Sequence, residues 1–105
     1  MESKHAQRRR IKDVNYDDNR VQVTGYVKEI PDKKHFVLDD RGGQIKVNIE
    51  QIDDFKFKKD DLINVIGDID LKTDGEKIIQ ADIIQDMSKL NFKYYLKIYE
   101  LKRQF

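Results

Sequence analysis

The chain has 105 residues, no cysteine and a formal net charge of +1, with 21 basic and 20 acidic side chains. This length suits one domain with its own hydrophobic core. The lack of cysteine excludes disulfides and thiolate chemistry and fits a reducing compartment. No apolar run reaches the length of a membrane span, and the first ten residues lack the apolar centre of a secretion signal. We therefore expect a soluble intracellular protein with no membrane contact.

Residues 1–10, MESKHAQRRR, are polar and basic and contain almost nothing to bury. This composition predicts a disordered basic arm before the folded domain. The three consecutive arginines either hold a nucleic-acid backbone or form a solvated tail. Basic residues that displace phosphate counterions supply most of the affinity for nucleic acids. The near balance of charge therefore predicts weak binding by the isolated chain, unless the charges segregate on its surface.

Residues 11–87 contain five segments in which apolar and polar residues alternate, the pattern of half-buried strands. The first is 20–30, and the others are 34–39, 44–49, 61–72 and 76–85. Asp74-Gly75 predicts a tight hairpin between the last two segments. Gly25 and Gly67, in the middle of the first and fourth strands, predict sharp bends. We therefore expect an all-β fold, a five-stranded closed barrel of the OB type.

Between the second and third strands, Asp39-Asp40 precedes Gly42-Gly43. Neighbouring residues on a strand point to opposite faces, so the two carboxylates do not share a cleft for acid–base catalysis. Aspartate before a glycine turn accepts hydrogen bonds from turn amides, and glycine takes the positive φ that such a turn needs. The glycine pair matches no phosphate-binding loop, and the two histidines lie thirty positions apart. We interpret this stretch as a hairpin and expect neither an enzyme nor a metal site.

Residues 88–105 change to helical periodicity without Gly or Pro, with Ser88 as the predicted N-cap. The apolar surface of this helix is wider than the face of about 100° that a surface helix needs. The excess predicts an oligomerisation surface; the alternative is that the barrel covers all of it. The residues that we expect on this surface are Leu90, Tyr94, Tyr95, Leu96, Ile98, Leu101 and Phe105.

Four motifs precede the helix in a fixed order: GYV at 25–27, FVLDDRGG at 36–43, NVIG at 64–67 and IIQDM at 83–87. In this order and spacing the chain resembles the OB-fold subunits of replication protein A, over about residues 8–105. The resemblance is greatest to the small or middle subunit of the archaeal heterotrimeric single-stranded-DNA-binding complex. It implies a role in DNA replication, repair and recombination, with single-stranded DNA and other replication protein A subunits as partners. It also implies no cofactor and a cytoplasmic, nucleoid-associated location.

The ligand face of an OB fold lies over its second and third strands, beside the loops that join strands one to two and four to five. Such domains stack bases on aromatic rings within a basic groove. Tyr26 and His35 are the candidates for stacking, the lysines for phosphate contacts and Asn48 for a base edge. The third strand offers no stacking ring, and the family's D-D-G-T-G is here DDRGG. The candidate nucleic-acid-binding residues are Tyr26, Lys28, Lys33, Lys34, His35, Val37, Lys46, Asn48, Lys72 and Lys77.

Three alternatives stay open at this point. The chain is either a purely architectural OB subunit without nucleic-acid contact, or an OB module for RNA or a telomere-type end-protection complex. The isolated chain could also form a homo-oligomer through residues 88–105 in place of the heterotrimer.

Overall fold

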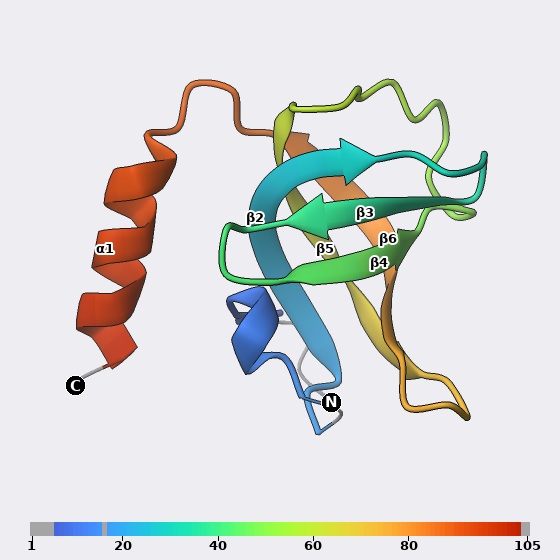
Figure 1. Cartoon of the computed structure of the whole chain (residues 1–105), viewed down its shortest axis with the longest axis horizontal. Helices are drawn as coiled ribbons and strands as arrows, with labels where there is room; N and C mark the ends of the chain where they lie inside the picture. Colours follow the sequence, from blue (N-terminus) through green and yellow to red (C-terminus); the bar gives the residue numbers. More distant parts are fainter. Residues whose placement is uncertain (1–5, 16, 104–105) are drawn as a thin grey trace.

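The computed structural model describes residues 6–15 and 17–103, in which a six-stranded sheet curls into a closed barrel (Figure 1). The strand order is β1-β2-β3-β4-β6-β5, and β2 also pairs with β5. The five-stranded OB barrel with a C-terminal helix is confirmed, with β2 to β6 as the five predicted strands. The predicted hairpin at Asp74-Gly75 joins β5 to β6, and Gly75 has a φ of 90°. The elements are β1 (Gln7–Arg8), the 3-10 helix η1 (Ile11–Asp13), β2 (Arg20–Glu29), β3 (His35–Asp39), β4 (Gln44–Asn48), β5 (Leu62–Leu71), β6 (Lys77–Asp86) and α1 (Phe92–Arg103).

Strand β2 bends so that residues 20–26 pair with β5 and residues 26–29 pair with β3. At this bend a Cβ on Gly25 would lie 2.8 Å from the carbonyl oxygen of Asp39. Strand β5 has a register irregularity at Gly67, where the backbone of Gln80 occupies the place of a Cβ. Both central glycines therefore permit close approach of neighbouring strands where the barrel curves, as the sequence predicted.

The core is formed by the inward side of the alternating strand residues, and both ends of the barrel are covered. The segment between β4 and β5 covers one end: the rings of Phe55 and Phe36 stack with centroids 5.2 Å apart. Ile11 and Val14, in and after η1 at the bottom of Figure 1, join the core as well. None of the described residues of α1 belongs to this core, so the helix lies beside the barrel and not across its end.

The prediction of a disordered arm over residues 1–10 is wrong for residues 6–10; residues 1–5 lie outside the described part. Strand β1 pairs in parallel with β2. Arg9 Nη2 lies 3.1 Å from Asp18 Oδ1, and Arg10 Nε lies 3.4 Å from Asp40 Oδ2. Two of the arginines are therefore neutralised by carboxylates of the barrel, which is why a segment with little to bury is ordered.

The β3–β4 turn is closed by a hydrogen bond from the Asp40 amide to the Gly43 carbonyl, but its positive φ falls on Arg41, at 69°. The expectation that the glycines supply this conformation is wrong. A Cβ on Gly42 would meet only the end of the flexible Arg10 side chain, which could move aside. A Cβ on Gly43 would lie 3.2 Å from the Ile11 side chain.

Helix α1 begins at Phe92, four residues after the predicted N-cap Ser88. Asn91 caps it instead, because its Oδ1 accepts a hydrogen bond of 3.0 Å from the amide of Tyr94. Leu90 therefore precedes the helix, and Phe105 lies outside the described residues. Within the described residues, no helix has the length and apolar character needed to span a membrane.

Candidate nucleic-acid interface and assembly surface

The outer faces of β3 and β4 bring several predicted binding residues together. In the antiparallel register, His35 lies opposite Asn48 and Val37 lies opposite Lys46, and all four side chains are half-buried. This set is called the β3–β4 face below. Lys33 and Lys34 lie in the adjacent β2–β3 loop, while Lys72 and Lys77 lie where the β5–β6 hairpin begins and ends. The sequence pattern therefore predicted which residues share this face.

The lysines of this region are largely matched by carboxylates of the same chain. Four of the six predicted lysines form ion pairs with N–O distances of 3.3–3.8 Å, and Lys77 Nζ donates a hydrogen bond to the carbonyl of Val14 at 2.9 Å. A phosphate group would have to compete with these carboxylates, which lowers the gain from each contact. The pairs are Lys28–Asp39, Lys34–Glu50, Lys46–Glu76 and Lys72–Asp70.

The two polar groups that we expected to contact bases also have partners. Asn48 Nδ2 donates to Glu50 Oε1 at 3.0 Å, and this bond, together with the charge of Lys34, lowers the pKa of Glu50. His35 Nδ1 lies 3.2 Å from Asp32 Oδ1. The amide of Lys34 donates to the same oxygen and, with His35, lowers the pKa of Asp32. Both carboxylates therefore remain charged at neutral pH and oppose a phosphate on this face.

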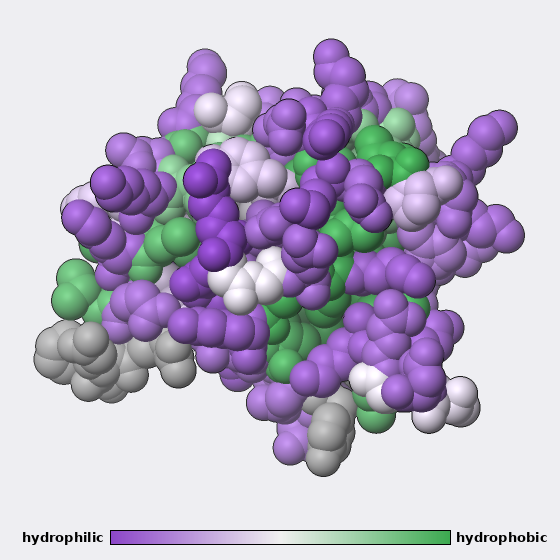
Figure 2. Space-filling view, viewed as in Figure 1, coloured by the Kyte–Doolittle hydropathy of each residue, from purple (hydrophilic) through white to green (hydrophobic). Residues whose placement is uncertain are grey.

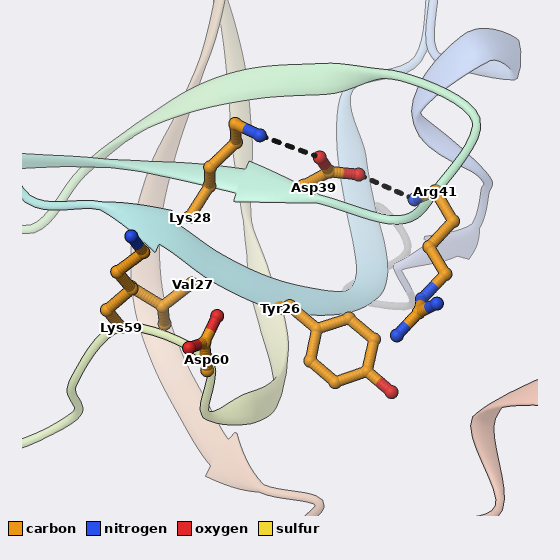
Figure 3. A pocket seen from close by; sticks show the side chains of 7 residues that line it. All are labelled: Tyr26, Val27, Lys28, Asp39, Arg41, Lys59 and Asp60. Carbon is orange, nitrogen blue, oxygen red and sulfur yellow. Dashed lines mark hydrogen bonds and ion pairs between the residues drawn. The ribbon is translucent and has the colours of Figure 1, made fainter.

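Tyr26, the other predicted stacking residue, links three parts of the molecule. Its ring makes an edge contact with Phe92 of α1, with centroids 5.2 Å apart, and the guanidinium of Arg41 lies 4.8 Å from its centroid. Figure 3 shows Arg41 reaching toward this ring from the β3–β4 turn. Both partners lie far from Tyr26 in the sequence, so periodicity could not predict these contacts. The role of Tyr26 in base stacking stays a prediction.

Two adjoining depressions share Tyr26 and Arg41, and together they form the barrel–helix groove. The first, seen in Figure 3, is lined by Tyr26, Val27, Lys28, Asp39, Arg41, Lys59 and Asp60. The second is lined by Tyr26, Arg41, Asn91, Phe92, Lys93 and Leu96. Sequence reasoning missed Arg41, Lys59 and Lys93 as candidate binding residues. Only Arg41 carried a signal, because it departs from the family pattern at the turn.

The paired carboxylates Asp39 and Asp40 both serve the turn. Asp39 Oδ1 accepts a hydrogen bond of 2.6 Å from the amide of Arg41, and Asp40 Oδ1 accepts one of 3.0 Å from the amide of Gly42. These are the local contacts expected of aspartates in a turn. In the part of the chain that the structure describes, no cluster of three or more His, Cys, Asp or Glu residues could hold a metal ion.

Helix α1 has two different apolar sides. Phe92 and Tyr99 are buried toward the barrel and the N-terminal segment, where the Tyr99 hydroxyl donates to Asp13 Oδ2 at 2.9 Å. Tyr94 is 62% exposed and Leu101 is 52% exposed, with the half-buried Ile98 between them. These three form the outward stripe of α1, and in Figure 2 a few hydrophobic side chains stand among mostly hydrophilic ones at this edge of the molecule. Of the other predicted oligomerisation residues, Tyr95 and Leu96 are half-buried.

A closed barrel with an appended helix that exposes an apolar stripe defines the chain as an OB-fold subunit. The family model described as "Telomere-capping, CST complex subunit" (Ten1) matches residues 5–105. The chain belongs to this family.

Solved structures show the same fold at low sequence identity. A chain of the S. pombe Stn1–Ten1 complex matches with a TM-score of 0.76 and 16% identity, over 98% of this chain and 96% of that one. The S. pombe telomere-capping protein Ten1 matches with a TM-score of 0.75 and 15% identity, over 96% and 100%. The hypothetical protein ygiW from E. coli matches with a TM-score of 0.63 and 19% identity, over 78% and 91%. None of the curated proteins matches the chain.

The family corrects the resemblance to replication protein A in part. The OB fold and the type of subunit are as expected, but the complex of this family is the telomere-capping CST complex. Each motif that carried the resemblance is a feature of OB barrels in general. Their order therefore identified the fold and not the complex, and the telomere-type alternative is the better supported one.

Proposed function

We propose that this chain is a subunit of a telomere-capping complex, held in it by the outward stripe of α1. Its family supports the telomeric role. A similar structure is that of a complex between Stn1 and Ten1, so the partner we propose is a protein of the Stn1 type. A telomere-bound subunit would act in the nucleus, and we propose no enzymatic activity for it.

The observation that carries this proposal is the exposure of Tyr94 and Leu101 on a helix whose other side is already buried. With Ile98 they follow the spacing of anchors that a helix places in an apolar groove. Complete burial of an exposed apolar side chain such as Leu101 contributes about 1.5–3 kcal/mol. The barrel cannot cover this stripe without releasing Phe92 and Tyr99. Binding of a second protein at the stripe would therefore remove this apolar surface from water.

The test is association with the Stn1-type protein of the same organism, measured by titration calorimetry and by light scattering after co-purification. The double variant Tyr94→Ser/Leu101→Asp should lower the affinity about 100-fold or more, because it removes two central anchors. Lys102→Gln, an exposed change on the same helix, is the matched control and should bind normally. Circular dichroism of both variants verifies that the barrel and helix remain folded. Unchanged affinity of the double variant would refute the proposal.

A purely architectural role is the second candidate function, and the ion-paired lysines of the β3–β4 face favour it. In that case the chain would hold its partner without touching nucleic acid. Charge reversal of Lys34 and Lys46, and also of Arg41 and Lys93 in the barrel–helix groove, would then leave the DNA affinity of the assembled complex unchanged. Self-association of the isolated chain through α1, the homo-oligomer that the sequence suggested, would use the same stripe and would compete with the partner.

A further inference from the structure

We infer that the barrel–helix groove, and not the β3–β4 face, binds single-stranded nucleic acid. This inference rests on the proposed function and names a binding site for it. The groove runs from Lys59, before β5, past Tyr26 and Arg41 to Lys93 on α1. A strand lying in it would therefore contact the barrel, the β3–β4 turn and the helix together.

The charge of the groove distinguishes it from the β3–β4 face. Its lining contains four basic side chains and two acidic ones. Among the described residues, Arg41, Lys59 and Lys93 form no ion pair, while the fourth cation of the groove, Lys28, pairs with Asp39 of the same lining. At and beside the β3–β4 face, Lys34, Lys46 and Lys72 are each paired with a carboxylate. Phosphates that bind the groove do not have to displace a carboxylate from these three cations. The full free energy of counterion release therefore contributes to binding at these three cations.

The Arg41–Tyr26 pair supplies a surface for bases. A guanidinium stacked on a ring keeps its N–H donors at the edge, where they can reach a phosphate or a base. Bases stack on arginine planes as well as on aromatic rings. Phe92 holds the Tyr26 ring from its edge, so the platform is oriented before a ligand arrives. Arg41 takes a positive φ in a turn fixed by two aspartates, which limits its movement further.

The groove and the outward stripe use different residues of α1. Phe92 and Leu96 line the groove, while Tyr94 and Leu101 are exposed. The two surfaces adjoin, because Leu96 and Leu101 also line one depression together. A protein partner that contacts the stripe still leaves Tyr26, Arg41 and Lys59 accessible on the barrel side of the groove.

The experiment measures binding of the full chain to fluorescein-labelled single strands by anisotropy at low salt. DNA and RNA oligomers of the same sequence and about 16 nucleotides in length cover one OB-fold site. Comparing them shows whether the groove prefers DNA or RNA. Arg41→Gln, Lys59→Gln and Lys93→Gln should each weaken binding about three- to ten-fold. Each should also reduce the slope of log affinity against log salt by about 0.7. Lys34→Gln and Lys46→Gln are the matched controls and should stay within about two-fold.

Arg41→Lys separates charge from stacking, because it keeps the cation and removes the plane. Weaker binding with an unchanged salt slope supports the platform. The inference is overturned if the control lysines carry the binding and the groove residues do not, or if the unmodified chain binds neither oligomer at low salt. It is also overturned if the groove variants lose the protein partner while nucleic-acid affinity is unchanged. Normal partner association with no groove effect leaves the proposed function standing, so the two failures can be told apart.

Discussion

The buried carboxylate of Asp40 joins the N-terminal segment to the β3–β4 turn. Its Oδ2 accepts hydrogen bonds from the amide of Ile11 at 2.7 Å and from Arg10 Nε at 3.4 Å, and its Oδ1 accepts one from Gly42. Asp40→Asn removes the charge and turns an NH2 group toward donors. We expect the free energy of unfolding, measured in urea, to fall by about 2–4 kcal/mol. Asp39→Asn, a more exposed neighbour, should cost less than about 1 kcal/mol; equal losses would contradict this assignment.

At these two residues the sequence predicted the turn and its hydrogen bonds but not the difference between the aspartates. Alternation places Asp39 and Asp40 on opposite faces, and this is what the structure shows. Which of them is buried depends on residues 6–11, whose composition suggested an arm. A buried carboxylate needs a cationic partner, and that partner, Arg10, lies thirty positions earlier. Local pattern carries no information about such a contact.

The register between strands β5 and β6 shifts at Gly67, and a side chain at this position should be costly. The backbone of Gln80 stands where a Cβ would be placed, so Gly67→Ala has to move strand β6. We expect a loss of about 3 kcal/mol in the free energy of unfolding, measured by urea titration. Gly75→Asn is the control for strain without a clash: nothing lies near that position, so only the strain of its positive φ is added, and asparagine accepts such a φ better than most residues. A loss for Gly67→Ala no larger than that of the control would show that the bend is adaptable.

The five strands of the barrel were predictable because burial alternates along β3 and β4 and along parts of β2, β5 and β6, which leaves a period of two in the sequence. Strand β1 was not, since its two exposed residues bury no side chain and pair only through the backbone. The start of α1 was displaced for a related reason. Ser88 and Asn91 are both good caps, and only the path of the chain after β6 decides between them. The local sequence was thus enough to predict the periodic strands. The short strand β1 and the exact start of α1 depend on contacts between elements.

For the whole molecule, the candidate site also combines features that the local sequence predicts with features that depend on contacts between elements. The residues of the β3–β4 face were brought together as predicted, because strand register follows from alternation. Their ion pairs and the groove beside α1 were not predicted, because both depend on how loops and the helix lie against the barrel. Lys46 and Glu76, for example, come from different hairpins. The site that we infer for nucleic acid is therefore one that only the assembled fold could reveal.

The position of α1 on the whole molecule depends on Tyr99, whose hydroxyl accepts a hydrogen bond from the Arg10 amide at 3.2 Å and donates to Asp13. Tyr99→Phe leaves that amide without this partner, at a cost of about 1–2 kcal/mol. Because the buried residues of α1, Phe92 and Tyr99, lie outside the hydrophobic cluster of the barrel, we expect this loss to appear as local opening of the helix. Hydrogen exchange of the α1 amides should become about ten-fold faster, while protection of the β2–β6 amides changes little. Tyr94→Phe, on the exposed side of α1, should leave exchange unchanged, and an equal loss of protection in α1 and the barrel would show that the two unfold as one unit.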